Sequence, residues 1–125
     1  MFIEKTVQLE QVSAGIFKTL TSLTYVSNKA EVIKVPIDYV TDGYSKPTLT
    51  QSIVGGRYED DVRPSTLHDF LCQNRGYFIE NKLVKLSFNR VNNLFYEAMI
   101  SVGIKKRKAL LMRIAVEFNP TRFRW

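Results

Sequence analysis

The clearest structural signal in the chain comes from the stretch SFNRVNNLFYEAMISVG, residues 87–103. Apolar side chains recur there every three or four positions, and this spacing places them on one face of an α-helix. They are Val91, Leu94, Phe95, Ala98, Met99 and Val102. Because the side chain of Ser87 can cap the first turn and Gly103 can end the last one, the sequence predicts an amphipathic helix between them.

Two further helices are predicted, one before and one after this stretch. The earlier helix has Pro64, a residue suited to the first turn, and Gly76 can end it. Its apolar stripe consists of Leu67, Phe70 and Leu71. The later helix covers about residues 105–118 and stops at Asn119-Pro120. Because it is apolar around most of its circumference, we expect it to be sandwiched in the core.

The N-terminal part of the chain has the pattern of β-strands. Residues 17–26 are rich in Thr, Tyr, Leu and Val and predict one strand, and the turn-like residues 27–29 follow it. Apolar side chains then alternate at Ile33, Val35, Ile37 and Tyr39. The two segments predict a hairpin, and Pro36, which has no N–H donor, puts the second strand at a sheet edge or interrupts it. Residues 77–86 predict a small hairpin or an ordered loop.

These elements predict an α+β fold, with a small antiparallel N-terminal sheet packed against about three C-terminal helices. The 125 residues, 45% hydrophobic and 24% charged, fit one globular domain over residues 1–125. We expect its core at about 14–118 and an aromatic-basic tail at 119–125. Residues 41–61 are rich in turn signals and predict irregular backbone with one short helical turn at about 49–54.

No apolar run approaches the roughly 20 residues that a membrane-spanning helix needs. The first residues, MFIEK, lack the basic-then-apolar pattern of a signal peptide, so we expect a soluble protein made in a cytoplasm.

The supply of metal-binding side chains is small. One cysteine, Cys72, rules out an intramolecular disulfide and every zinc site that needs two thiolates. One histidine, His68, rules out sites built from two or three histidines. A metal held by His68, Cys72 and Asp42 has permissive spacing, but free cysteine on an apolar helix is usually packing. We therefore predict no metal and no cofactor.

Two segments carry a family resemblance. The first is VPIDYVTDGYSKP, residues 35–47, followed by His68-Asp69 on the earlier helix; the second is SFNRVNNLFYEAM, residues 87–99. In order and spacing they resemble a signature of small bacteriophage and prophage proteins of unassigned function. That signature is roughly V-P-x-G-F-x-T-D-x-x-S-x-P, then H-D, then S-x-x-x-A-D-x-x-F-x-x-x-M. The resemblance covers about residues 24–118.

The chain departs from this signature at two places. Asp38-Tyr39 stands where the family usually has Gly-Phe, and Asn92 stands where the family's helix has an aspartate. The second change removes a negative charge from the polar cluster of the motif, which weakens any divalent-metal proposal that depends on it.

The polar residues of the signature can be interpreted in two ways. They are Asp42, Ser45, His68, Asp69 and Asn92. In the structural interpretation they hydrogen-bond nearby groups and tie the 41–61 segment to the helices. In the catalytic interpretation Ser45 is a nucleophile activated by His68, and Asp42 or Asp69 orients the imidazole. Ser45 lacks the glycine-flanked elbow that often presents such a serine, so the structural interpretation is favoured.

The formal net charge is +6, with a pI near 9.6, which suggests affinity for a polyanion or simply good solubility. A basic run at Lys105, Lys106, Arg107 and Lys108 begins the last helix, where cations oppose the positive end of the helix dipole. This run could contact an anion, DNA or an acidic partner, or it could be solvated. The tail residues Arg122, Phe123, Arg124 and Trp125 are types enriched at interfaces, and we expect them to dock on a neighbouring subunit or on the chain's own core.

The favoured function is that of a non-enzymatic structural or virion-associated phage protein of the tail or adaptor region. Its partners would be other virion proteins in an oligomeric assembly, and it would pass from the host cytoplasm to the virion. The first alternative is a small hydrolase of bacterial cell-wall material that uses Ser45, His68 and Asp42 or Asp69. The second alternative is an accessory factor that contacts DNA.

Overall fold

The computed structural model describes residues 1–41 and 61–118. Within these residues the strands come first and three helices dominate the C-terminal half, so the predicted α+β class is confirmed. The strands are β1 (Leu9–Ser13), β2 (Ile16–Thr19), β3 (Leu23–Val26), β4 (Val32–Val35), β5 (Val40–Thr41), β6 (Gly76–Ile79) and β7 (Lys82–Lys85). The helices are α2 (Arg63–Asn74), α3 (Phe88–Ser101) and α4 (Lys106–Glu117). None of these helices is long and apolar enough to cross a membrane.

The strands form three small antiparallel units rather than one sheet. They are the sheet β1-β2-β5 and the pairs β3-β4 and β6-β7. The predicted hairpin between β3 and β4 is confirmed, with Leu23 opposite Val35 and Tyr25 opposite Ile33. These four side chains are fully buried, since alternation along both strands turns them to the same inner face.

Residues 17–26 do not form the single strand that the composition predicts. The chain leaves β2 at Thr19 and begins β3 at Leu23, and the two strands belong to different sheets. Thr19 is fully buried; its hydroxyl donates to the Pro36 carbonyl at 2.8 Å, and its backbone N–H donates to the Tyr39 carbonyl at 2.9 Å. These contacts with residues distant in sequence fix the bend, and a local pattern carries no information about them.

The second predicted strand is interrupted at Pro36, as expected. β4 ends at Val35, and β5 begins at Val40 beside β2. Strand β1 was not predicted, because four of its five residues are exposed and the segment lacks apolar alternation.

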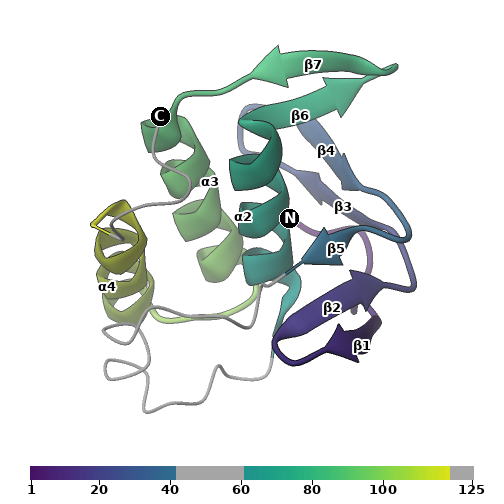
Figure 1. Ribbon diagram of the computed structural model, residues 1–125. Coiled ribbons are helices and arrows are strands. Elements are labelled where there is room, and N and C mark those ends of the chain that lie inside the picture. The colour runs from purple at the N-terminus through teal and green to yellow at the C-terminus, as the bar shows by residue number, and fades with distance from the viewer. Residues whose placement is uncertain (42–60, 119–125) are drawn as a thin grey trace.

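The helices pack side by side, with α3 between α2 and α4 (Figure 1). The main core lies between the strands, α2 and one side of α3, and includes Tyr25, Leu67, Phe70 and Leu94. A second, smaller core joins the other side of α3 to α4. The predicted capping of α3 is confirmed, since Ser87 Oγ accepts a hydrogen bond from the Arg90 backbone N–H at 3.0 Å.

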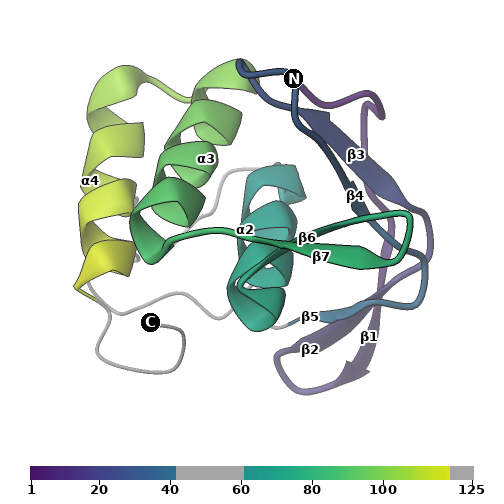
Figure 2. The ribbon, with the colours of Figure 1, turned by 90° about the horizontal axis from the view of Figure 1, so that it is seen from above.

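The β6-β7 hairpin starts directly after α2 and lies over its end (Figure 2). Arg75 ends the helix with a left-handed backbone, φ 54°, and Gly76 follows with φ 155°. A Cβ at Gly76 would lie 2.0 Å from the Val84 carbonyl oxygen of β7. Only glycine therefore allows β6 to run this close to β7 at the base of the hairpin.

The prediction that the last helix is sandwiched in the core is wrong. Helix α4 packs mainly on α3, and its buried side chains are Ala109, Met112 and Ala115. Its opposite side carries a second apolar row, and that row is exposed. The helix is apolar on two sides, as the sequence indicates, but only one side meets another described element.

Candidate functional site

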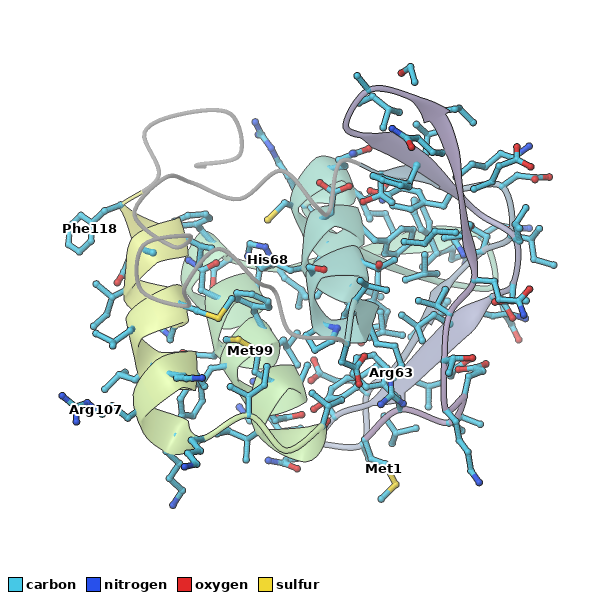
Figure 3. The ribbon with its side chains drawn as sticks, turned by 90° about the horizontal axis from the view of Figure 1, so that it is seen from below. Met1, Arg63, His68, Met99, Arg107 and Phe118 are labelled. Carbon is cyan, nitrogen blue, oxygen red and sulfur yellow. The ribbon has the colours of Figure 1, made fainter. Side chains whose placement is uncertain are left out.

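The only histidine lies between α2 and α3, where Figure 3 labels it. Nε2 of His68 is 2.9 Å from Oδ1 of Asn92 on α3. The ring also packs on Phe95, with ring centroids 4.4 Å apart and planes tilted by 32°. Cys72, one turn further along α2, places Sγ 3.5 Å from Nε2 and 3.9 Å from Nδ1. Two helices thus hold the imidazole in one place.

Burial sets the charge state of this imidazole. Part of the residue remains accessible, but the ring is surrounded by protein atoms, which lowers the pKa of His68 to about 4, and the Asn92 hydrogen bond opposes this shift only partly. His68 is therefore neutral at physiological pH. With the Asn92 oxygen as acceptor, the hydrogen-bond pattern assigns the proton to Nε2 and leaves Nδ1 as an acceptor.

Asn92, the partner of His68 on α3, is fully buried. Its Oδ1 meets His68, whereas its Nδ2 has no hydrogen-bond partner among the described residues. An amide at this position keeps the His68 pair neutral. A carboxylate in the same place would attract a proton to the imidazole and raise its pKa.

Asp69, the next residue on α2, is buried and faces the strands rather than α3. Its Oδ2 accepts hydrogen bonds from the Tyr39 hydroxyl and from the Gln73 side-chain amide, each at 2.9 Å. Tyr39 also packs edge-on against Phe70, with centroids 5.2 Å apart. The hydroxyl of Tyr39 is therefore a donor to a buried carboxylate.

These contacts give the two adjacent signature residues of α2 opposite directions. His68 ties α2 to α3, and Asp69 ties α2 to the segment between β4 and β5. Buried polar groups that are paired in this way fix the relative positions of the elements they join. The contacts fit the structural interpretation of the polar cluster. Asp42 and Ser45 lie outside the described residues, so the site that would combine them with His68 stays a prediction.

The proposed metal ligands are brought together only in part. His68 and Cys72 are neighbours, and Asp42 lies outside the described residues. Within residues 1–41 and 61–118, no group of three or more His, Cys, Asp and Glu side chains is placed to hold a metal ion. His68, Asn92 and Cys72 form a packed polar junction between α2 and α3.

The basic run begins α4 as predicted, with Lys105 at the N-cap. All four side chains are exposed, the first turn contains no acidic residue, and none of the four has a carboxylate partner among the described residues. The predicted interface residues Arg122, Phe123, Arg124 and Trp125 lie outside the part of the chain that the structure describes.

The outward row of α4 is a surface that the sequence analysis missed. It consists of Leu110, Leu111, Ile114 and Phe118, whose exposed fractions are 50%, 37%, 39% and 69%. We call these four residues the α4 stripe. The sequence contains a signal for this surface, because a helix with two separate apolar rows leaves one row exposed when a single neighbour packs on the other. Figure 3 shows Phe118 and Arg107 pointing away from the rest of the molecule.

Comparison with known proteins supplies a family. A family model described as "Protein of unknown function (DUF1353)" matches residues 17–116. An uncharacterized protein of Sinorhizobium fredii, y4iH, is 33% identical over 87 residues, which make up 68% of this chain and 31% of the relative. The chain thus spans about a third of that relative's length. No solved structure matches. With the family model covering most of its length, the chain belongs to the DUF1353 family.

Proposed function

We propose that this protein is a non-enzymatic, virion-associated structural protein of a bacteriophage, of the tail or adaptor region, that acts by contacting other virion proteins. The observation that carries the proposal is the α4 stripe. Four large apolar side chains stand in one exposed row on a helix whose opposite side is already packed. Single exposed apolar residues are ordinary, but contiguous apolar rows of this kind are typical of surfaces that bind other molecules.

The stripe is not needed to hold α4 in place. Ala109, Met112 and Ala115 bury the inner side of α4 against α3. Arg113 adds hydrogen bonds to the side-chain oxygens of Asn89 and Asn93, each at 2.9 Å. Since the helix is anchored without the stripe, the stripe is free to serve a second contact.

The polar residues of the family signature support a non-enzymatic role. His68 is neutral and bonded to an amide, whereas a general base near neutral pH needs a pKa close to that pH. Asp69 accepts hydrogen bonds from Tyr39 and Gln73. In the described part of the chain, both side chains make hydrogen bonds that join α2 to neighbouring elements. The phage assignment itself rests on the resemblance of residues 35–47, 68–69 and 87–99 to the phage and prophage signature.

The test is incorporation into particles. We expect Leu111→Asn with Ile114→Asn to reduce the amount of this chain in purified particles of its phage at least tenfold, measured by quantitative mass spectrometry. The matched control is Val32→Asn with Ile37→Asn, because both residues are 56% exposed and lie away from α4. This control should be incorporated like the wild type.

Melting temperatures of the isolated variants must be compared first, so that a variant that fails to fold is not mistaken for one that fails to bind the particle. Absence of the wild-type chain from the particles would refute the virion assignment. Equal incorporation of the stripe variant would refute the role of α4 in it.

A further inference from the structure

We propose that the α4 stripe binds the α4 stripe of a second copy of this chain, with the two helices antiparallel about a two-fold axis. The inference rests on the proposed function, because it names the partner of the same surface. A two-fold contact uses one patch twice, and the patch must therefore be complementary to itself.

The positions of the outward residues suit packing against another helix. Arg107, Leu110, Leu111, Ile114 and Phe118 follow one another at spacings of three and four residues. Side chains with these spacings lie on one face, which is the arrangement by which one helix packs along another. The row extends over most of α4, so the contact would be between helices along their length.

An antiparallel arrangement pairs unlike residues in a consistent register. A two-fold axis beside the midpoint between Met112 and Arg113 places Leu111 opposite Ile114 of the second copy. The same register brings Lys106 to within about 3 Å of Glu117 of the second copy along the helix axis, and both residues lie on the same flank of the stripe. It also brings Arg107 to the ring of Phe118 of the second copy, a cation–π pairing. Each contact occurs twice, because the axis exchanges the two chains.

The charge distribution of α4 favours the antiparallel direction. The helix begins with Lys105 to Lys108 and has no acidic residue in its first turn, whereas it ends with Glu117 and has no basic residue in its last turn. The helix dipole is positive at the first end and negative at the second. Antiparallel pairing sets the basic end of each copy beside the acidic end of the other. Parallel pairing would bring two basic runs together.

The contact would be weak and dependent on concentration. Four apolar side chains per copy make an interface below the size of stable, specific complexes, which bury about 1,200–2,000 Å². We expect a dimer that forms in the micromolar range or above in isolation. In an assembly, where copies are held near each other, the same contact would be strengthened by the high local concentration.

Sedimentation equilibrium of the full chain over a series of concentrations tests the pairing. The wild type should shift from the mass of one chain to that of two, and Leu111→Asn should require at least tenfold higher concentration for the same shift. Val32→Asn, at an exposed apolar position remote from α4, should behave like the wild type. A wild-type chain that stays monomeric throughout overturns the proposal.

Charge reversal tests the register. Lys106→Glu and Glu117→Lys should each weaken the dimer severalfold, and the double variant should recover wild-type association. Glu117 also meets Arg113 of its own helix at 3.3 Å, and that contact is lost in the double variant as well. Recovery therefore reports the pairing between copies, and failure to recover overturns the register.

Engineered cysteines test the direction, and the native Cys72 is buried. Arg107→Cys mixed with Phe118→Cys should give a cross-linked dimer on mild oxidation. Arg107→Cys alone should not, because its copies would be offset by about 16 Å along the axis at 1.5 Å per residue. The reverse result indicates parallel pairing and overturns the proposal.

Two results separate this inference from the proposed function. If the isolated chain never dimerises but stripe variants are lost from particles, the stripe binds a different virion protein, and only the self-pairing fails. If Leu111→Cys resists a thiol reagent at every concentration, the chain covers its own stripe, and both proposals fail.

Discussion

Helices α3 and α4 differ in how many of their apolar faces are covered. On α3, one face with Val91, Leu94 and Ala98 joins the main core, and Phe95 and Met99 on the other face join the core shared with α4. On α4, one face is packed on α3, and the α4 stripe is exposed. The apolar pattern of a helix therefore indicates how many of its faces can pack against a neighbour. It does not say whether the neighbour belongs to the same chain.

The largest effect should come from truncating a buried leucine of α3, with a leucine of the α4 stripe as the matched comparison. Leu94→Ala, at a fully buried position of α3, should lower the free energy of unfolding by about 2–5 kcal/mol, because a cavity remains in the core. Leu110→Ala, at the half-exposed stripe, should change it by about 0.5 kcal/mol or less. Urea unfolding at low protein concentration measures both values without a contribution from self-association.

A comparable loss in both variants would break this comparison. It would mean that the outer face of α4 is buried within the single chain, as the inner face is.

The second test concerns the polar junction at the α2 side of α3. The pKa of His68 is about 4 in the folded protein and 6.5 by its ordinary value, so the unfolded chain binds a proton that the folded chain does not. His68 therefore contributes stability that is fully present above its unfolded pKa and is lost as the pH falls toward 4. Between about pH 7.5 and 5 the loss should be about 2 kcal/mol. His68→Gln should lack this part of the pH dependence.

Asn92→Asp provides the opposite case. The new carboxylate beside the ring should raise the pKa of His68 by favouring the imidazolium, and should remove or reverse the pH dependence that His68 causes. Because the chain has one histidine, its ring protons in an NMR titration can be followed without assignment. An unchanged midpoint in this variant would show that Asn92 does not control the imidazole.

The smallest effect should come from the contact of α2 with the strand side. Tyr39→Phe removes the hydroxyl that donates to the buried Asp69 and keeps the aromatic ring. We expect a loss of about 1–2 kcal/mol in urea unfolding, since a buried carboxylate loses one of its hydrogen bonds. Tyr96→Phe is the control, because its hydroxyl makes no hydrogen bond among the described residues. Equal losses would mean that the hydroxyl of Tyr39 is not the cause.

Much of the fold could be predicted from local patterns. The capping of α3 by Ser87 and the turn after β3 depend on neighbouring residues, and both were predicted correctly. The division of residues 17–26 depends on the contacts of Thr19 with Pro36 and Tyr39, which no local pattern contains. The exposure of the α4 stripe was missed for the same reason, because burial is decided by neighbours in space.

The candidate site was predictable as a set of residues but not as an arrangement. The sequence placed His68, Asp69 and Asn92 in one polar cluster. It could not show that the first two face opposite sides of α2, or that an amide rather than a carboxylate contacts the ring. Those facts depend on how α2 is rotated between its neighbours.

The glycine at the base of the β6-β7 hairpin restricts how this part of the chain can vary. Any side chain at Gly76 would collide with the backbone of β7, so the base of the hairpin is closed to substitution. The far end is different: Glu80 and Asn81 form an exposed two-residue turn, with both backbones in the left-handed region. Insertions, affinity tags or cross-linking groups would accordingly be accommodated at this turn, and lengthening the hairpin from there would leave its junction with α2 undisturbed.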